Sequence, residues 1–184
     1  MLSGCAGIGV IETSDPAVKL SDAGYLQDRD RPLIAERLIR EATEIYQSKN
    51  DQLGLAKSNM AYGHFFMSPT LEGKWSTFYR ERGFIDKSAT YDSRYEKAIE
   101  YFEKALPVLR DHQKYDKMTN AYANEGFVYV MLGKREAACQ AFDKSLQSYH
   151  DNIQQNPEAK PIAPQGFGSF EEYLTYRKKV INCK

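Results

Sequence analysis

The side chains that could carry out chemistry are few and scattered along the chain. The three histidines, His64, His112 and His150, do not share a helical turn, and no pair of cysteines has the spacing of a zinc site. Paired carboxylates such as Glu171-Glu172 fall on predicted helix surfaces, where solvation is their usual role. The sequence therefore predicts a protein that is not an enzyme and that uses no metal or cofactor.

Two glycine motifs are also poor candidates for a catalytic or nucleotide site. Gly7-Ile8-Gly9 lacks the third glycine and the preceding strand of a dinucleotide-binding fold, and the chain has no Walker loop. Residues 166–169 read as a turn and a helix cap rather than as a nucleophile turn. An enzyme acting on peptidoglycan, the least favoured alternative, would need an acid–base pair in a cleft, and no such pair stands out.

The composition allows one ordinary folded domain. Hydrophobic residues make up 42% of the 184 residues, which is enough for a core. The 25 basic and 25 acidic side chains cancel, so nothing in the charge indicates a nucleic-acid partner. No stretch approaches the roughly 20 apolar residues that a membrane-spanning helix needs.

Apolar residues recur at three- and four-residue steps over most of the chain, which predicts helices. Breaks of a few residues between them indicate antiparallel hairpins. A longer insertion interrupts the series at 68–92, and a loop is expected at 151–168. The predicted helices cover 32–48, 52–67, 71–82, 93–111, 115–132, 134–150 and 169–181.

One segment, 119–146, resembles the tetratricopeptide repeat. Small residues are expected where the two helices of a hairpin approach each other, and aromatic residues where neighbouring hairpins meet. Glu125 departs from the pattern, because the family prefers leucine at that position. The residues that match the pattern are Tyr122, Gly126, Tyr129, Gly133, Ala138, Phe142 and Ser145.

Two weaker copies extend the resemblance. Residues 62–66 and 95–106 look like the first and second helices of a repeat that the insertion splits, and 35–42 look like half of an earlier, decayed repeat. We therefore expect an all-α fold of antiparallel tetratricopeptide-like hairpins over 32–184, closed by a C-terminal capping helix at 169–181. A generic helical bundle is the alternative.

The resemblance implies a binding groove, because the first helix of each hairpin lines a concave face in this family. Two asparagines four residues apart could hydrogen-bond a peptide backbone there. Only one lysine supplies a positive charge, so a carboxylate clamp is not supported. A solvent-facing residue at the helix start is the alternative role for Asn120. The predicted groove residues are Lys57, Met60, His64, Asn120, Asn124, Phe127 and Met131.

The insertion is too rich in aromatic residues for a solvated linker. Trp75, Phe78 and Tyr79 lie within five residues of one another. Loops of this length in compact domains are often functional. These side chains either pack under the helices or flank the groove and meet a partner, and we favour packing.

The N-terminal residues Leu2-Ser3-Gly4-Cys5 resemble the lipobox of bacterial lipoproteins, in which the cysteine carries lipid. Residues 1–31 would then be the lipidated start and a flexible tether. The basic and apolar segments of a signal peptide do not precede Cys5, so this interpretation implies a longer precursor. A cytosolic protein with an accidental match is the alternative. Ala6 is not the aspartate associated with inner-membrane retention.

Two further cysteines, Cys139 and Cys183, leave two interpretations open. They could form a disulfide in an exported protein. Alternatively, Cys139 is a small buried side chain and Cys183 a terminal thiol, and we favour this second interpretation.

Taken together, these patterns predict a lipid-anchored adaptor or assembly factor on the periplasmic face of an outer membrane. Proteins of similar design serve as scaffolds in envelope or secretion-machine complexes. The expected partner is a protein or peptide, with membrane contact only through lipid on Cys5 and no nucleic acid. A cytosolic tetratricopeptide co-chaperone or regulator that binds a peptide tail is the alternative, and the oligomeric state is left open.

Overall fold

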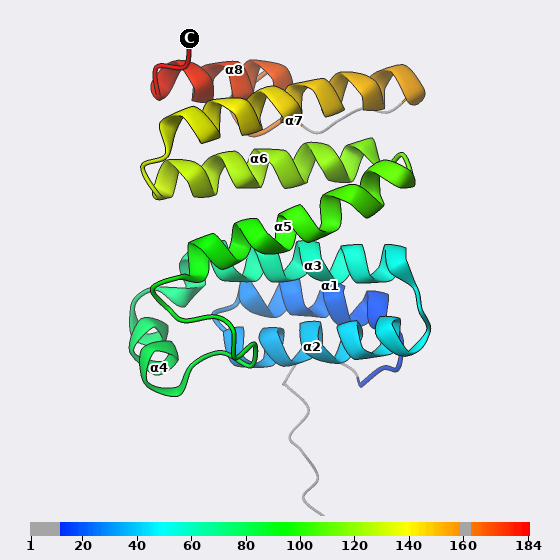
Figure 1. The fold of residues 1–184 in the computed structure, drawn as a ribbon, viewed down its shortest axis with the longest axis vertical. Coiled ribbons are helices and arrows are strands. Elements are labelled where there is room, and N and C mark those ends of the chain that lie inside the picture. Colours follow the sequence, from blue (N-terminus) through cyan, green and yellow to red (C-terminus); the bar gives the residue numbers. More distant parts are fainter. Residues whose placement is uncertain (1–11, 159–162) are drawn as a thin grey trace, which may run out of the picture. The chain divides into compact units, whose positions relative to one another are not determined.

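The structure is a computed structural model that describes residues 12–158 and 163–184. These residues form helices and no strand, so the predicted all-α class is confirmed. None of these helices is both long enough and apolar enough to span a membrane. The helices, drawn in Figure 1, are α1 (Pro16–Gln27), α2 (Pro32–Ser48), α3 (Gln52–Met67), a short 3-10 helix η1 (Pro69–Leu71), α4 (Lys74–Arg82), α5 (Arg94–Asp111), α6 (Tyr115–Met131), α7 (Arg135–Gln155) and α8 (Phe170–Val180).

The chain divides into two compact units, one ending at Tyr101 and the other running from Phe102 to Lys184. The division falls within α5, so the first unit holds α1 to α4 with the start of α5. The second unit holds the rest of α5 with α6, α7 and α8.

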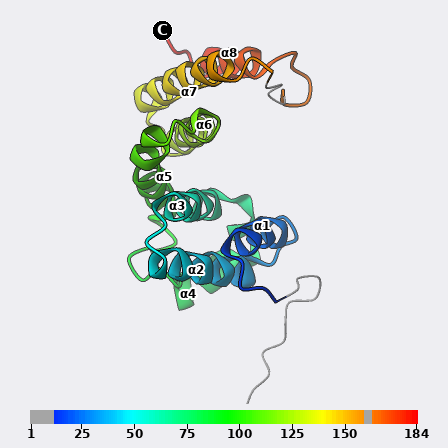
Figure 2. The same cartoon turned by 90° about the vertical axis from the view of Figure 1, so that its right-hand side faces the viewer.

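In the first unit, α1, α2 and α3 pack side by side (Figures 1 and 2). The apolar stripe of α2 is buried, with Ala35 and Ala42 inaccessible to solvent, and Pro32 begins the helix as the sequence indicated. Asp51 caps α3 by accepting a hydrogen bond from the backbone N of Gly54 at 2.8 Å. A Cβ atom at Gly54 would lie 2.0 Å from the Tyr46 ring, so glycine permits the close approach of α2 and α3.

The assignment of 1–31 as a flexible tether is wrong for its last part, because Pro16–Gln27 forms α1. The buried face of α1 is partly polar, so its sequence shows no continuous apolar stripe. Lys19 forms an ion pair with Glu41 at 2.6 Å. Gln27 donates from Nε2 to the backbone oxygen of Phe65 at 3.4 Å. These partners allow the two polar side chains to be buried beside Ala23 and Leu26.

In the second unit, α6 and α7 form an antiparallel hairpin that contains the repeat-like segment 119–146 (Figure 1). Gly133 has a φ of +68° in the turn, a backbone conformation that suits glycine. A Cβ atom at Gly126 would lie 2.4 Å from Cε1 of Phe142, and Ala138 is fully buried. Phe142 therefore packs within its own hairpin as well as in the core that it shares with Leu174 of α8.

Helix α8 lies against α7 and closes the second unit (Figures 1 and 2). The Ser169 hydroxyl caps it by accepting from the backbone N of Glu172 at 3.0 Å, as predicted. The Glu172 carboxylate returns to the backbone N of Gly168 at 2.7 Å rather than to Ser169. The preceding helix, α7, continues to Gln155, five residues beyond its predicted end at 150.

The contact between Gly126 and Phe142 gives a first prediction. Gly126→Ala is expected to lower the free energy of unfolding by about 1–3 kcal/mol, because the new methyl group overlaps the ring. Gly24→Ala in α1 is the matched control, since nothing lies within 4 Å of the added atom. It should stabilise by about 0.5–1 kcal/mol. Urea denaturation of both variants measures the difference, and equal effects would exclude the contact.

Candidate functional site

The predicted groove residues on α3 differ in exposure. Lys57 and His64 are exposed. Met60 is only 8% exposed and belongs to the core of the first unit. Lys57 and His64 are thus the accessible residues of this set on α3, although desolvation of the imidazole lowers the pKa of His64.

The predicted groove residues on α6 form a mixed face of the second unit. Asn120 is exposed, Met131 is 50% exposed, and Asn124 and Phe127 are half-buried. The Phe127 ring lies 6.1 Å from the ring of Tyr173, and the Arg177 guanidinium lies 4.8 Å from its centroid. Helix α8 therefore covers part of this face. Because the α3 and α6 residues belong to different units, a single groove remains a prediction.

An aromatic row runs along α8 and the segment before it, where the sequence predicted only a capping helix. The Phe167 ring lies 5.1 Å from Tyr173 and 5.4 Å from Tyr176, and Tyr173 continues the row to Phe127. Tyr176 is 52% exposed. The signal available in the sequence was the spacing of Tyr173 and Tyr176 on one face of a helix. The row gives the second unit an accessible apolar surface beside the exposed end of α6.

The insertion is a packed element rather than a slack loop. Tyr79 and Phe84 are each 1% exposed, their rings stack at 4.4 Å, and both contact Phe65 of α3. The guanidinium groups of Arg80 and Arg94 both lie over the ring of Tyr91, at 4.4 and 4.2 Å from its centroid. Packing, the alternative favoured from sequence, thus holds for the central aromatic residues of the insertion.

The outer aromatic residues of the insertion, Trp75 and Phe78, are half-buried with their rings 5.9 Å apart. Trp75 donates from Nε1 to the Asp30 carboxylate at 2.6 Å, and Lys74 forms an ion pair with the same carboxylate. These bonds hold the start of α4 against the connection between α1 and α2. The hydrogen bond to Lys74 is also the main reason why the pKa of Asp30 is lowered.

The Asp30 contact makes Trp75, the single tryptophan, a reporter for the insertion. Asp30→Ala should increase acrylamide quenching of its fluorescence and shift the emission to longer wavelength, because the indole loses its anchor. Asp28→Ala, a neighbouring exposed carboxylate, should leave both unchanged. Identical quenching in the wild type and Asp30→Ala would show that the anchor does not hold in solution.

A buried carboxyl group that sequence reasoning missed joins the insertion to α2. Glu36 is 2% exposed and accepts a hydrogen bond from the backbone N of Ile85 at 2.6 Å. Burial raises its pKa to about 7. The Tyr79 phenol lies beside this carboxyl group, and burial raises the pKa of that phenol as well. In the sequence, Glu36 directly follows Ala35 of the apolar stripe of α2. An acidic residue at the edge of the buried face was the feature that could have indicated this contact.

The second unit contains a cavity of about 260 Å³ between α5, α6 and α7, close to Glu125. Glu125 is the residue that departs from the repeat pattern. It is 5% exposed, its Oε1 atom has no hydrogen-bond partner in the described residues, and burial raises its pKa to about 7. The cavity is lined by Glu103, Leu106, Pro107, Arg110, Tyr122, Glu125, Tyr129, Ala137, Gln140, Ala141 and Lys144.

The comparisons with known proteins add no family. No protein-family model matches the chain, and no curated protein matches it. In the described ranges, 12–158 and 163–184, no group of three or more His, Cys, Asp or Glu side chains is placed to hold a metal ion.

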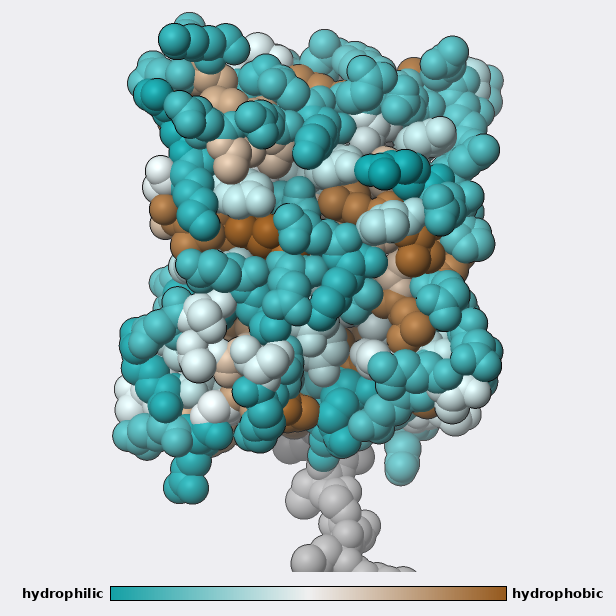
Figure 3. Space-filling model, viewed as in Figure 1, coloured by the Kyte–Doolittle hydropathy of each residue, from teal (hydrophilic) through white to brown (hydrophobic). Residues whose placement is uncertain are grey.

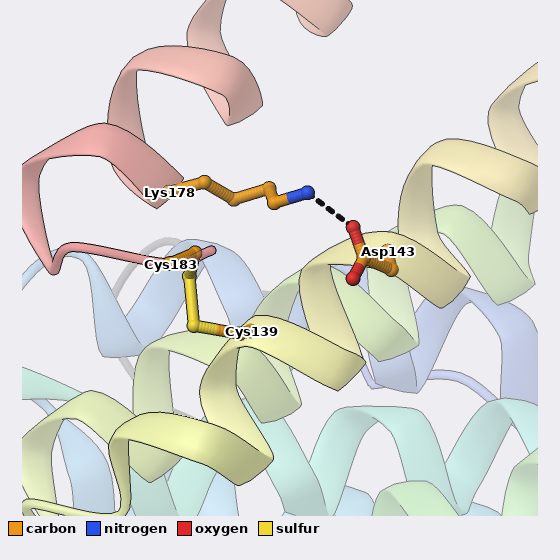
Figure 4. Close-up of a disulfide and its surroundings, with 4 residues drawn as sticks. All are labelled: Cys139, Asp143, Lys178 and Cys183. Atoms are coloured by element: carbon orange, nitrogen blue, oxygen red, sulfur yellow. Dashed lines mark hydrogen bonds and ion pairs between the residues drawn. A yellow bond between two sulfur atoms is a disulfide. The ribbon is translucent and has the colours of Figure 1, made fainter.

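The three cysteines separate into two cases. Cys5, the predicted lipidation site, lies outside the described residues. Cys139 and Cys183 form a disulfide that joins α7 to the segment after α8 (Figure 4). The interpretation favoured from sequence, a buried side chain and a free terminal thiol, is therefore wrong. The antiparallel packing of α8 on α7 brings the two residues together, and Lys178 pairs with Asp143 beside them.

Proposed function

We propose that the protein is a non-catalytic adaptor or assembly factor that binds another protein or peptide. The observation that carries this proposal is the two-sided character of α6. One side packs Gly126 into the hairpin, and the other displays Asn120 and Met131 beside the aromatic row of Phe127 and Tyr173. Exposed apolar and aromatic side chains mixed with amide groups are typical of protein-binding surfaces.

A tetratricopeptide-like design is part of the proposal. Helix α1 packs on α2 and supplies the first helix that the decayed repeat lacked. In the split copy, the Tyr62 ring of α3 stacks at 4.7 Å on Tyr101 of α5, although the insertion separates the two helices in sequence. These contacts support paired helices at each of the three positions where the sequence resembles the repeat.

The distribution of hydrophobic side chains on the surface also supports binding of a partner through a small patch. On the face drawn in Figure 3, most side chains are hydrophilic and the hydrophobic ones gather in small groups between them. The strongly exposed large hydrophobic residues of the second unit are Met131, Tyr176 and Val180. A partner would therefore be recognised by a few apolar contacts within a polar surround.

Site-specific photocrosslinking tests the binding surface. A photoreactive phenylalanine analogue at Asn120 or Met131 should give a discrete adduct in the cells that naturally produce the protein. The same analogue at Gln147, an exposed position of α7, should not. Equal labelling at all three positions, or none at Asn120 and Met131, would contradict the proposed surface.

We also propose that the adaptor is lipid-anchored at Cys5 on the periplasmic face of an outer membrane. The lipobox-like start supports this location. The disulfide between Cys139 and Cys183 supports it as well, because disulfides persist in oxidising compartments and are rare in the cytosol.

Membrane flotation tests the anchor. Produced with a signal peptide, the wild type should carry two or three acyl chains on Cys5 and float with outer membranes, since each buried methylene contributes about 0.8 kcal/mol. Cys5→Ser should be released into the soluble periplasmic fraction. Mass spectrometry of the N-terminal peptide identifies the acyl chains, and equal flotation of both proteins would refute the anchor.

A further inference from the structure

The cavity beside Glu125 contains a buried carboxyl oxygen that the fold does not pair. Glu125 is 5% exposed, and no described group hydrogen-bonds its Oε1 atom. A buried acceptor without a donor carries a free-energy cost that the leucine of the repeat pattern would avoid. The side chain lines a hollow that also includes exposed residues, so a group from solution can reach the hollow.

Charges of both signs line this cavity. On α5, Glu103 and Arg110 are seven residues apart, which is roughly 10 Å along a helix. Tyr129 lies at the Glu103 end, because Glu125 and Glu103 both contribute to the raised pKa of its phenol, after burial. The Glu103 end therefore combines two carboxyl groups with an aromatic ring.

The two positive side chains that line the cavity both contact Tyr122. Arg110 donates from Nη2 to the Tyr122 hydroxyl at 3.2 Å. The Lys144 ammonium lies 5.7 Å from the centroid of the Tyr122 ring. Both side chains are exposed, and they line the cavity from α5 and α7 respectively. The Lys144 charge also acts on Glu125, where it opposes the rise in pKa that burial causes. No described side chain donates a hydrogen bond to Glu125 Oε1, so this oxygen can still accept one from a cationic donor.

We propose that this cavity binds a basic side chain of a partner polypeptide, a lysine ammonium or an arginine guanidinium, between Glu125 and Glu103. The inference rests on the proposed protein-binding function and names the chemistry that the partner must present. Such a group donates to Glu125 Oε1, satisfies the buried acceptor and places its charge beside the half-buried ring of Tyr129. The cavity volume of about 260 Å³ suits one side chain rather than a drug-sized ligand.

Two-dimensional NMR of the full chain, at a pH above the value of about 7 for the Glu125 pKa, tests the inference with small probes. Nα-acetyl-lysine N-methylamide and its arginine analogue should give saturable shifts at the amides of Glu125 and Tyr129, with a Kd on the order of 1 mM. The Nε-acetylated lysine probe, which is neutral, should give none. Putrescine tests whether any free amine suffices, and equal affinity for it would overturn the assignment to a polypeptide side chain.

Two variants separate a binding role from a structural one. Glu125→Gln keeps the shape and should weaken both cationic probes at least tenfold. Glu125→Leu restores the residue of the repeat pattern and should fold while abolishing the shifts. Glu136→Gln, an exposed neutralisation on the adjacent turn of α7, should bind as the wild type does. Unchanged binding by Glu125→Gln, or no saturable shift in the wild type, would overturn the inference. The photocrosslinks at Asn120 and Met131 would still stand as an independent test of the proposed function.

Discussion

Removal of the Cys139–Cys183 disulfide is expected to lower the free energy of unfolding of the second unit by about 4 kcal/mol. The two residues are separated by 44 positions, and closing a loop of that length reduces the entropy of the unfolded chain by about this amount in the chain-entropy model. The loss should be concentrated in α8, because the bond ties the C-terminal segment to α7. Chemical denaturation of the Cys139→Ser/Cys183→Ser double variant measures the change.

A neighbouring interaction gives the control for this experiment. Lys178 pairs with Asp143 across the same two helices, but the Asp143 side chain is 58% exposed. An exposed ion pair contributes about 0–1 kcal/mol, so Lys178→Ala should change stability little. Hydrogen exchange should show the α8 amides opening in the double cysteine variant and not in Lys178→Ala. If the α8 amides exchange as slowly in both variants as in the wild type, the apolar contacts of α8 hold it in place without the covalent bond.

The helices with strong apolar stripes could be predicted from the sequence almost to the residue. Helices α2 and α3 begin and end where predicted, because Pro32 and Asp51 mark their starts and buried residues recur through them. Helix α1 could not be found in this way, because two of its buried residues, Lys19 and Gln27, are polar. Its available signal was Asp15-Pro16, since Asp15 caps the helix by accepting from the backbone N of Ala17 at 2.8 Å.

The features of the candidate sites depend on contacts between distant segments, which the sequence does not display. The disulfide requires α8 to fold back along α7. The position of Trp75 depends on Asp30, 45 residues away. Glu125 is the exception, because its departure from the repeat pattern was visible in the sequence. The cavity beside it could not be predicted, because three helices form its walls.

Glu36 gives the second large expected effect, on the pH dependence of stability. Burial raises the pKa of its carboxyl group in the folded protein from 4.5 to about 7. Below pH 4.5 the carboxyl group is mostly protonated in both the folded and the unfolded states, so it does not lower the free energy of unfolding. As the pH rises towards 7, the Glu36 carboxyl group ionises first in the unfolded state, which stabilises the unfolded state relative to the folded one. Stability should therefore fall across this window, by up to about 3 kcal/mol from Glu36.

Glu36→Gln should remove this part of the pH dependence, because the amide stays neutral and its oxygen can still accept from the backbone N of Ile85. Unfolding free energies measured between pH 4 and 8 should converge for the variant and the wild type at low pH. They should separate progressively between pH 4.5 and about 7, with the variant more stable. Glu44→Gln is the matched control on the same helix, since that side chain is 56% exposed. It should follow the wild-type curve within about 0.5 kcal/mol.

The connection between Glu36 and the insertion makes the same titration a structural test. Burial disfavours the ionised carboxyl group, although the backbone N–H of Ile85 donates to it, so ionisation should favour opening of the insertion that admits water before the rest of the first unit unfolds. Hydrogen exchange at the Ile85 amide should therefore exceed its intrinsic increase with pH in the wild type and follow that increase in Glu36→Gln. Parallel pH profiles in the two proteins would show that the carboxyl group is hydrated in solution, and the predicted loss of stability would then be absent as well.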